Sequence, residues 1–423
     1  MTERIERRDL LRGIGAAGAA GMLGLAGCVG GDGSSGGEIQ LGLLMGVTGG
    51  LSTLGPPIRS GAEGAVEQIN NGDTDWTVET RFEDTETAPG PGEDGAQAIA
   101  DAGFPMFVGA LASGVSIPVA NNVTLEQGLI QMSPASTAVE YETLDEGVDG
   151  TFTWRTAPSD AFQGQVAAEI ALNRIGAESV STIARDDAYG RGLSGEFSDA
   201  FSEGGGTVEQ ELTIDPSNDS FTSQLQTALD PGPDMLYVVA FTEEGQSLMR
   251  DFYQDFDQPD LPIVVSDGLQ AASLPADSGQ DVETFSNVTG TGPGISDDVA
   301  TGLDAYLDQV GEDTDGIFVR ESYDAAAVLS LARVAAGSDD PGDIGDAIPE
   351  VTSGDGMDVS AANLVEGINA AADGDDIVYS GVSRPLEFNE NGSVATPVYE
   401  YYEWGTDGGE ATLQTIDVIS GSN

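Results

Sequence analysis

The feature that most constrains the fold is a regular alternation of short apolar stretches and helical segments, which begins at Glu38. In the helical segments apolar residues recur every three or four positions. The predicted strands are 39–47, 76–82, 105–109 and 129–133, and then, after Pro158, 180–185, 207–214, 234–240 and 262–266. The predicted helices are 57–70, 96–102, 115–127, 160–175, 189–203, 219–229 and 244–256. Two successive series of this kind predict an α/β protein of two doubly wound lobes, each with a parallel sheet covered by helices.

The C-terminal part of the chain has a different pattern. Residues 379–404 are richer in aromatic and β-branched side chains, which favour strands. We therefore expect paired strands there.

The charge of the chain limits both its environment and its partners. It carries 73 acidic residues against 14 arginines, with no lysine and no histidine, for a formal net charge of −59. Such self-repulsion strains a compact state at ordinary ionic strength, whereas in about 1 M salt the Debye length falls to about 3 Å. The composition thus resembles proteins of salt-saturated habitats, such as those of halophilic archaea. It argues against a nucleic-acid partner, because phosphate binding needs clustered basic residues.

The absence of histidine also excludes several kinds of chemistry. No Ser-His-Asp triad, Cys-His pair or histidine-bound metal is possible. A glycosidase that uses a pair of carboxylates stays open on composition alone. The acid runs, such as Asp297-Asp298 and Asp375-Asp376, indicate solvated faces in preference to metal sites.

The first 28 residues resemble an export signal. Arg7 and Arg8 precede an apolar run over 13–26, which ends in Leu-Ala-Gly before Cys28. The arginine pair resembles a twin-arginine signal, and the ending resembles a lipobox whose cysteine becomes lipidated. An uncleaved anchor is the alternative, although the run is shorter than the ~20 residues of a spanning helix. Residues 29–37 read as a flexible linker that would hold the body at the outer face of the cell membrane.

The loops that follow the predicted strands are where an open α/β sheet binds its ligand. The loop after 39–47 lacks the Gly-x-Gly-x-x-Gly spacing of a dinucleotide site. Several segments instead resemble, in the right order, the leucine/isoleucine/valine-binding family of type I periplasmic solute-binding proteins, which serve ABC importers. They are Leu43-Leu44-Met45-Gly46-Val47-Thr48-Gly49-Gly50, Val108-Gly109 with Ser113, Ser133-Pro134-Ala135-Ser136-Thr137, Trp154-Arg155-Thr156-Ala157-Pro158-Ser159-Asp160, Asp186-Asp187-Ala188-Tyr189-Gly190, Ser266-Asp267-Gly268 and the late stretch from Tyr379-Ser380-Gly381 to Phe388-Asn389-Glu390-Asn391-Gly392.

The resemblance implies a division of the chain into lobes. It places 38–155 and about 290–380 in the first lobe, and 156–289 and about 381–423 in the second. The hinge would have three crossings, near 154–158, 287–293 and 379–385. Closure of the lobes over a small solute would present the closed form to a membrane permease.

The resemblance also implies the roles of five residues. Ser113 and Thr137 would donate hydroxyl hydrogen bonds to a ligand carboxylate, and Ala135 would contribute main-chain bonding. Tyr189 would cover the ligand from the second lobe, and Asp267 would accept from its ammonium group. Structural alternatives exist for most of them: Ser113 could cap the helix that follows, the loop of Ala135 and Thr137 could be an ordinary turn, Tyr189 could pack on the sheet, and Asp267-Gly268 could be a turn.

The chain departs from the family at the ligand side-chain pocket. Leu54 and Ala240 stand where leucine binders carry aromatic residues, and Asp267 stands where glutamate is common. The expected ligand is an amino acid, branched-chain in type, while amides, urea and aromatic acids stay open. A sensing module for a signalling receptor is the rival function. We expect no enzyme activity, no metal and no cofactor.

Overall fold

The structure is a computed structural model that describes residues 36–423 apart from 149, 296–298, 300–302, 312–315 and 421–423. The predicted export signal, with Arg7, Arg8 and the lipid attachment site Cys28, lies outside the described residues. Among the residues that are described, none of the helices is both long enough and apolar enough to span a membrane.

The first sheet has five parallel strands in the order β2-β1-β3-β4-β5. Its strands are β1 (Glu38–Met45), β2 (Thr77–Asp84), β3 (Met106–Gly109), β4 (Ile130–Ser133) and β5 (Thr153–Arg155). The central strand β1 is almost continuously apolar because both faces of the sheet are covered. The predicted parallel α/β architecture is confirmed in this sheet.

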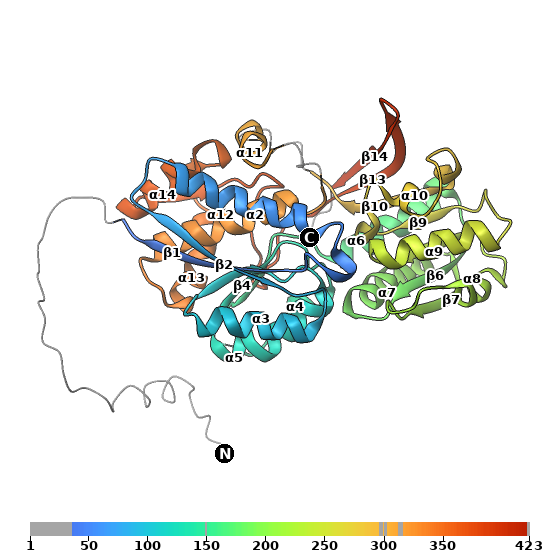
Figure 1. The fold of residues 1–423 in the computed structure, drawn as a ribbon, viewed down its shortest axis with the longest axis horizontal. Helices are drawn as coiled ribbons and strands as arrows, with labels where there is room; N and C mark the ends of the chain where they lie inside the picture. Colours follow the sequence, from blue (N-terminus) through green and yellow to red (C-terminus); the bar gives the residue numbers. More distant parts are fainter. Residues whose placement is uncertain (1–35, 149, 296–298, 300–302, 312–315, 421–423) are drawn as a thin grey trace, which may run out of the picture. The chain divides into compact units, whose positions relative to one another are not determined.

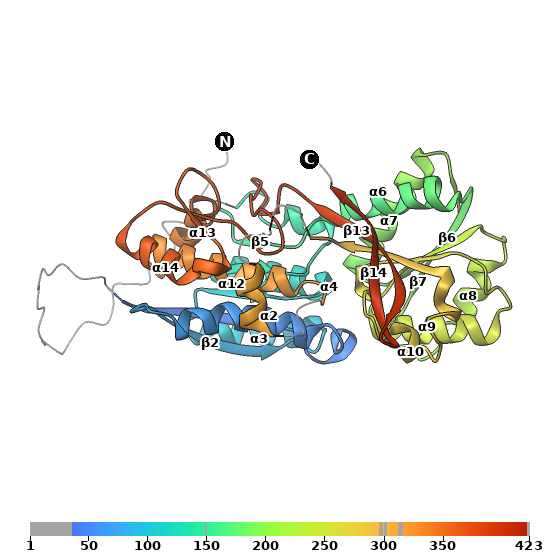
Figure 2. The same cartoon turned by 90° about the horizontal axis from the view of Figure 1, so that it is seen from above.

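Helices cover both faces of the first sheet (Figures 1 and 2). One face carries α2 (Gly55–Asn71), α12 (Val319–Ala336), α13 (Pro341–Thr352) and α14 (Leu364–Asp373). The other carries α3 (Pro89–Asp101), α4 (Ser113–Val119) and α5 (Leu125–Gln127). Helix α12 is buried over nearly its whole length, and a helix buried on all sides shows little apolar periodicity.

The second sheet has seven strands in the order β14-β13-β10-β9-β8-β6-β7. Its strands are β6 (Ser179–Arg185), β7 (Thr207–Ile214), β8 (Met235–Val239), β9 (Ile263–Val265), β10 (Val288–Pro293), β13 (Val398–Asp407) and β14 (Glu410–Ser420). Strands β6 to β10 are parallel, whereas β13 and β14 add an antiparallel edge. The predicted second doubly wound lobe is therefore confirmed, with an edge hairpin added to it.

Helices cover the second sheet as well (Figure 1). They are α6 (Asp160–Glu169) and α7 (Ala188–Glu203) on one face, with α8 (Thr222–Leu229), α9 (Thr242–Asp255) and α10 (Leu274–Asp277) on the other. The short helix α11 (Leu303–Val310) packs against α2 of the first lobe.

The C-terminal strands differ from the predicted pairing. Only 398–404 of the predicted 379–404 segment lies in β13, and its partner is the later strand β14. Gly408 and Gly409, with φ of 58° and 97°, form the connecting turn. Two left-handed residues match the twist of a tight hairpin, so this glycine pair carried the missing signal. Strand β12 (Ile377–Tyr379) instead pairs in parallel with β11 (Met357–Val359).

Two stretches near the expected lobe boundaries lie elsewhere than expected. Residues 290–293 continue β10 and pair with β13, so they hydrogen-bond in the second sheet and do not begin the first lobe. Residues 381–394 were expected in the second lobe, yet Arg384 forms an ion pair with Glu321 of α12 and Ser393 bridges to Arg155 of β5. A buried guanidinium needs its counter-charge close by, and this pair holds the stretch against the first lobe.

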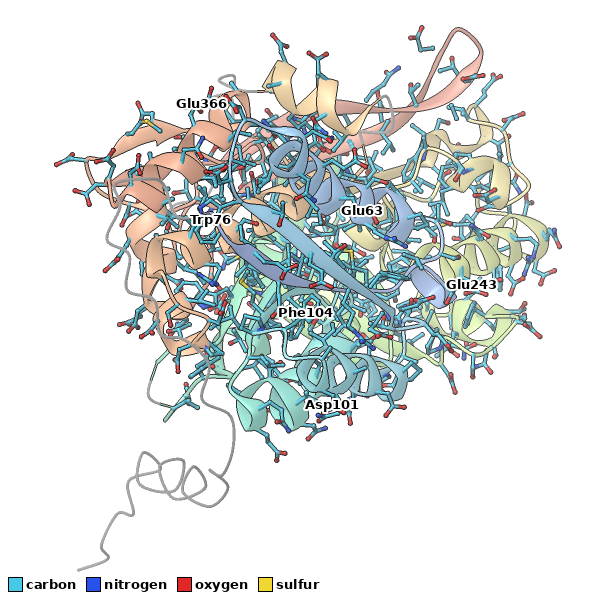
Figure 3. All side chains as sticks on the ribbon, turned by 60° about the vertical axis from the view of Figure 1, so that its left-hand side comes forward. Glu63, Trp76, Asp101, Phe104, Glu243 and Glu366 are labelled. Carbon is cyan, nitrogen blue, oxygen red and sulfur yellow. The ribbon has the colours of Figure 1, made fainter. Side chains whose placement is uncertain are left out.

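The acidic side chains are spread over the surface of the described body (Figure 3). Asp101, Glu243 and Glu366 are exposed, whereas Trp76 and Phe104 are buried against the sheet and helices. The acid-rich composition is therefore compatible with an ordinary apolar core.

Candidate functional site

A pocket lies where the loops after β3, β4, β8 and β9 meet, and its empty space, counted together with the part open to solvent, is about 330 Å³. These loops leave the carboxyl ends of parallel strands, where an open α/β sheet places its ligand. Residues of both lobes line it: Leu51, Leu54, Ile58, Leu111, Ala112, Ser113, Ala135 and Phe318 from the first, and Tyr189, Phe241, Asp267 and Gly268 from the second. Four of the five predicted site residues are thus brought together.

The first-lobe end of the pocket offers hydrogen-bond donors. Ser113 is buried at the start of α4, but Ala112 holds the N-cap position, so the serine does not cap its helix. Its Oγ accepts a 3.2 Å hydrogen bond from the backbone N–H of Ala138, which leaves the hydroxyl proton available to a ligand. Ala135 lies beside it on the loop after β4, and its N–H donates to Ser133 Oγ at 3.3 Å.

The second-lobe end is built around an acid. Asp267 is the second residue after β9, and its Oδ1 accepts from the Tyr189 hydroxyl at 2.7 Å and from Gln163 Nε2 at 2.8 Å. Burial raises the pKa of Asp267 to about 6, although both of these hydrogen bonds act to lower it. The Tyr189 hydroxyl also accepts from the N–H of Gly268 at 3.2 Å, so the tyrosine is fixed by three partners, including Ser266.

The walls between the two ends are apolar and partly aromatic. Leu54 lines the pocket as expected, whereas Ala240 is buried outside the lining, and the next residue, Phe241, takes the wall position. The Phe241 ring stacks on Tyr189 with centroids 5.4 Å apart, and the Arg185 guanidinium carbon lies over the Phe241 ring, 3.6 Å from its centroid. Tyr189 was expected in the pocket, whereas Phe241 supplies an aromatic side chain that the expectation from Leu54 and Ala240 did not include.

Two aromatic wall residues were missed from the sequence. Phe241 follows the apolar strand β8 within two residues, so the rule of loops after strands could have found it. Phe318 precedes α12 in a left-handed conformation with φ of 63° and follows no strand, so no local pattern marks it.

Thr137 is the one predicted site residue that does not line the pocket. Its side chain is buried, and its Oγ1 has no hydrogen-bond partner within the described residues. Its carbonyl accepts from the backbone N–H of Asp160 and from Arg155 Nη1, both at 2.8 Å. Thr137 thus lies behind the pocket, against the start of α6.

Arg155 holds the loop that carries Ala135. The fully buried guanidinium donates from Nη1 to the carbonyls of Thr137 and Ala138, at 2.8 and 2.9 Å, and forms an ion pair with Glu142. The sequence identified this arginine as part of a motif but gave it no role.

No group of three or more acidic, cysteine or histidine side chains in the described ranges could hold a metal ion. What the pocket can do is bind: donors at one end, an acid at the other and apolar walls between them.

Comparison with known proteins places the chain in a family. A family model described as periplasmic binding protein matches residues 38–408. The Leu/Ile/Val-binding protein homolog 1 of Brucella suis is 26% identical over 381 residues, which cover 89% of this chain and 93% of that protein. The match to homolog 3 of Brucella melitensis, at 28% identity, spans only 58% of that relative.

Solved structures share the fold. The leucine-binding protein LivK of Thermotoga maritima superposes with a TM-score of 0.72 at 24% identity, covering 90% of this chain and 98% of that one. A Rhodopseudomonas palustris solute-binding protein in complex with 4-hydroxybenzoate reaches 0.73 at 15% identity, covering 90% and 97%. The chain belongs to the periplasmic binding protein family, whose members are solute-binding proteins of ABC transporters and not enzymes.

Proposed function

We propose that this protein captures an amino acid with an apolar side chain, of the branched-chain type, for an ABC importer. The observation that carries the proposal is the polarity of the pocket. The Ser113 hydroxyl lies on its first-lobe side and the Asp267 carboxylate on its second-lobe side. A zwitterion needs donors for its carboxylate and an acid for its ammonium group, because burying either charge unpaired is costly.

Lobe closure follows from the same arrangement. A ligand favours the closed state only by as much as it binds that state better, so it has to contact both lobes. Ala135 and Ser113 come from the first lobe, and Tyr189 and Asp267 from the second. We infer that a ligand joins the lobes and that the closed form is what a permease recognises.

The proposal places the protein outside the cell, held by lipid on Cys28 after export through the Arg7-Arg8 signal. Such a tether would keep a capture protein beside its importer. A sensing module that hands the same closed form to a signalling receptor is the alternative partner, and neighbouring permease and ATPase genes would favour transport.

Calorimetry and thermal-shift measurements in multimolar salt test the ligand. Leucine, isoleucine and valine should bind, whereas acetamide, urea and 4-hydroxybenzoate should not. Asp267→Asn should abolish binding, because the amide presents an N–H in place of an acceptor. Asp186→Asn is the matched control, since Asp186 is exposed and paired with Arg191 away from the pocket. Stabilisation by the amides, by urea or by the aromatic acid in place of amino acids would contradict the proposal.

A further inference from the structure

A second carboxylate lies buried behind the pocket, and the proposed ligand contacts do not use it. Asp160 begins α6, its side chain is fully buried, and neither carboxylate oxygen has a hydrogen-bond partner in the described part of the chain. Its N–H donates to the Thr137 carbonyl at 2.8 Å, which fixes it against the loop that carries Ala135. A buried carboxylate without partners is strongly unfavourable when ionised, so Asp160 needs a proton or a cation.

Asp160 belongs to the same buried cluster as Asp267. Gln163, one helical turn after Asp160, donates to Asp267 Oδ1 at 2.8 Å and to the Thr291 carbonyl at 3.1 Å. Burial raises the pKa of Asp160 well above its usual range, and the charge of Asp267 raises it further, whereas the neighbouring Thr137 hydroxyl and the Arg155 charge act to lower it without offsetting the burial. Of the two acids, Asp160 therefore binds a proton first.

No other described group offers Asp160 a free positive charge. Arg155 is the base that acts on it, and this guanidinium is already bound to Glu142, Ser393 and three carbonyls. The remaining titratable groups that interact with Asp160 are Glu196, Tyr189, Tyr237 and Tyr399. Glutamate and tyrosine side chains are neutral or negative, so none of the four can supply a cation. Burial also raises the pKa of each, so the tyrosines stay neutral.

We propose that Asp160 and Asp267 act as one acid pair, which holds a proton on Asp160 in the ligand-free protein and releases it to solvent when a ligand ammonium group binds beside Asp267. The ammonium group keeps its own protons. The bond that breaks is the O–H of Asp160, which leaves a carboxylate next to the incoming positive charge. This inference rests on the proposed amino-acid function, because a carboxylic acid without an ammonium group brings no cation to the pair.

The number of protons released on ligand binding is measured by calorimetry in phosphate and in Tris, because the two buffers have different ionisation enthalpies and the binding enthalpies differ in proportion to the protons released. With leucine near pH 7, the wild type should release about one half to one proton, and Asp160→Asn about none. The ratio of the variant's Kd to that of the wild type should rise from about 1 near pH 5.5 to about tenfold near pH 8, because only there does the ionised Asp160 attract the ligand.

Asp145→Asn is the matched control. Burial also raises the pKa of Asp145, and its Oδ1 likewise has no partner within the described residues, but its Oδ2 binds Thr153 at the edge of the first sheet, outside the pocket lining. This variant should release as many protons as the wild type.

Infrared spectroscopy of the ligand-free protein gives a readout that needs no ligand, and the difference between the wild type and Asp160→Asn assigns the signal to Asp160. The carbonyl band of a protonated buried carboxyl should be present near pH 7, disappear in Asp160→Asn and persist in Asp145→Asn. Absence of that band in the wild type overturns the proposal, and so does the finding that the wild type releases no proton on binding leucine. Both results come from the wild type and hold even if Asp160→Asn does not fold. If no amino acid binds, the proposed function fails, and the infrared band still decides whether Asp160 carries the proton.

Discussion

Arg155 is the residue whose loss should damage the first lobe most, and the damage can be worked out from its contacts. Its guanidinium donates to the carbonyls of Thr137 and Ala138 at 2.8 and 2.9 Å, to Ser393 Oγ at 2.8 Å, and pairs with Glu142. Methionine in its place fills much of the volume but removes these donors and leaves Glu142 without its cation, while the Thr137 and Ala138 carbonyls keep only the backbone N–H groups of Asp160 and Tyr141. Removing one partner of a buried charged network costs about 3–5 kcal/mol.

That cost converts to a measurable shift. Unfolding entropy of about 2.1 cal/mol/K per residue gives roughly 0.8 kcal/mol/K for a body of about 385 residues, so Arg155→Met should lower Tm by about 5 °C. Arg191→Met is the control, because Arg191 and its partner Asp186 are 61% and 49% exposed, and such a pair contributes about 0–1 kcal/mol. Thermal unfolding followed by circular dichroism in multimolar salt measures both. Equal Tm values for the two variants would refute the anchoring role of Arg155.

Three further outcomes follow from the structure. Gly114→Leu should weaken leucine binding about tenfold or more and increase the radius of gyration of the ligand-bound protein in small-angle scattering, because a Cβ at this position already lies 3.3 Å from Asp187 of the other lobe. Gly192→Leu is the control: Gly192 faces open space, so this variant should change neither quantity. Burial raises the pKa of Asp324 from 3.8 to about 6, so between these pH values the folded state keeps a proton that the unfolded state has lost. The free energy of unfolding, measured with urea, should therefore fall by up to about 3 kcal/mol as the pH rises through this range, and Asp324→Asn should reduce that pH dependence. Dialysis to low salt should cause loss of helix signal in far-UV circular dichroism, because the Debye length grows to about 10 Å at 0.1 M and the net charge of −59 is no longer screened; a cooperative fold there would contradict the salt argument.

The parts of the fold that could be predicted are those in which local periodicity and burial agree. Strand β7 has the predicted bounds, 207–214, because its side chains alternate between exposed and half-buried positions. Helix α12 gave no such pattern, since it is buried on all sides, and tertiary packing alone defines it. The 381–394 stretch was assigned to the other lobe because its place depends on one long-range ion pair, Arg384 with Glu321.

The site residues likewise fall into some that could be predicted from the sequence and some that could not. Ser113, Ala135 and Asp267 each follow a strand, so the topology of a parallel sheet brings them to one edge, and the sequence could locate them. Phe318 reaches the pocket through a left-handed residue before a helix, and Asp160 reaches the cluster through the first turn of α6. Neither position follows from strand order, which is why neither Phe318 nor Asp160 was predicted as a site residue.

The large negative charge does not by itself account for an acid-lined pocket. In multimolar salt the field of exposed acids such as Asp101, Glu243 and Glu366 decays within a few ångströms, about 3 Å at 1 M, so it cannot select a ligand inside the protein. Asp267 is only 3% exposed, so salt ions have little access to the place where the proposed ammonium group would bind. The surface charge therefore acts on stability and solubility, whereas the charge preference of the pocket is set by the few buried groups around Asp267. Changing the salt should accordingly move the free energy of unfolding more than the affinity for ligand.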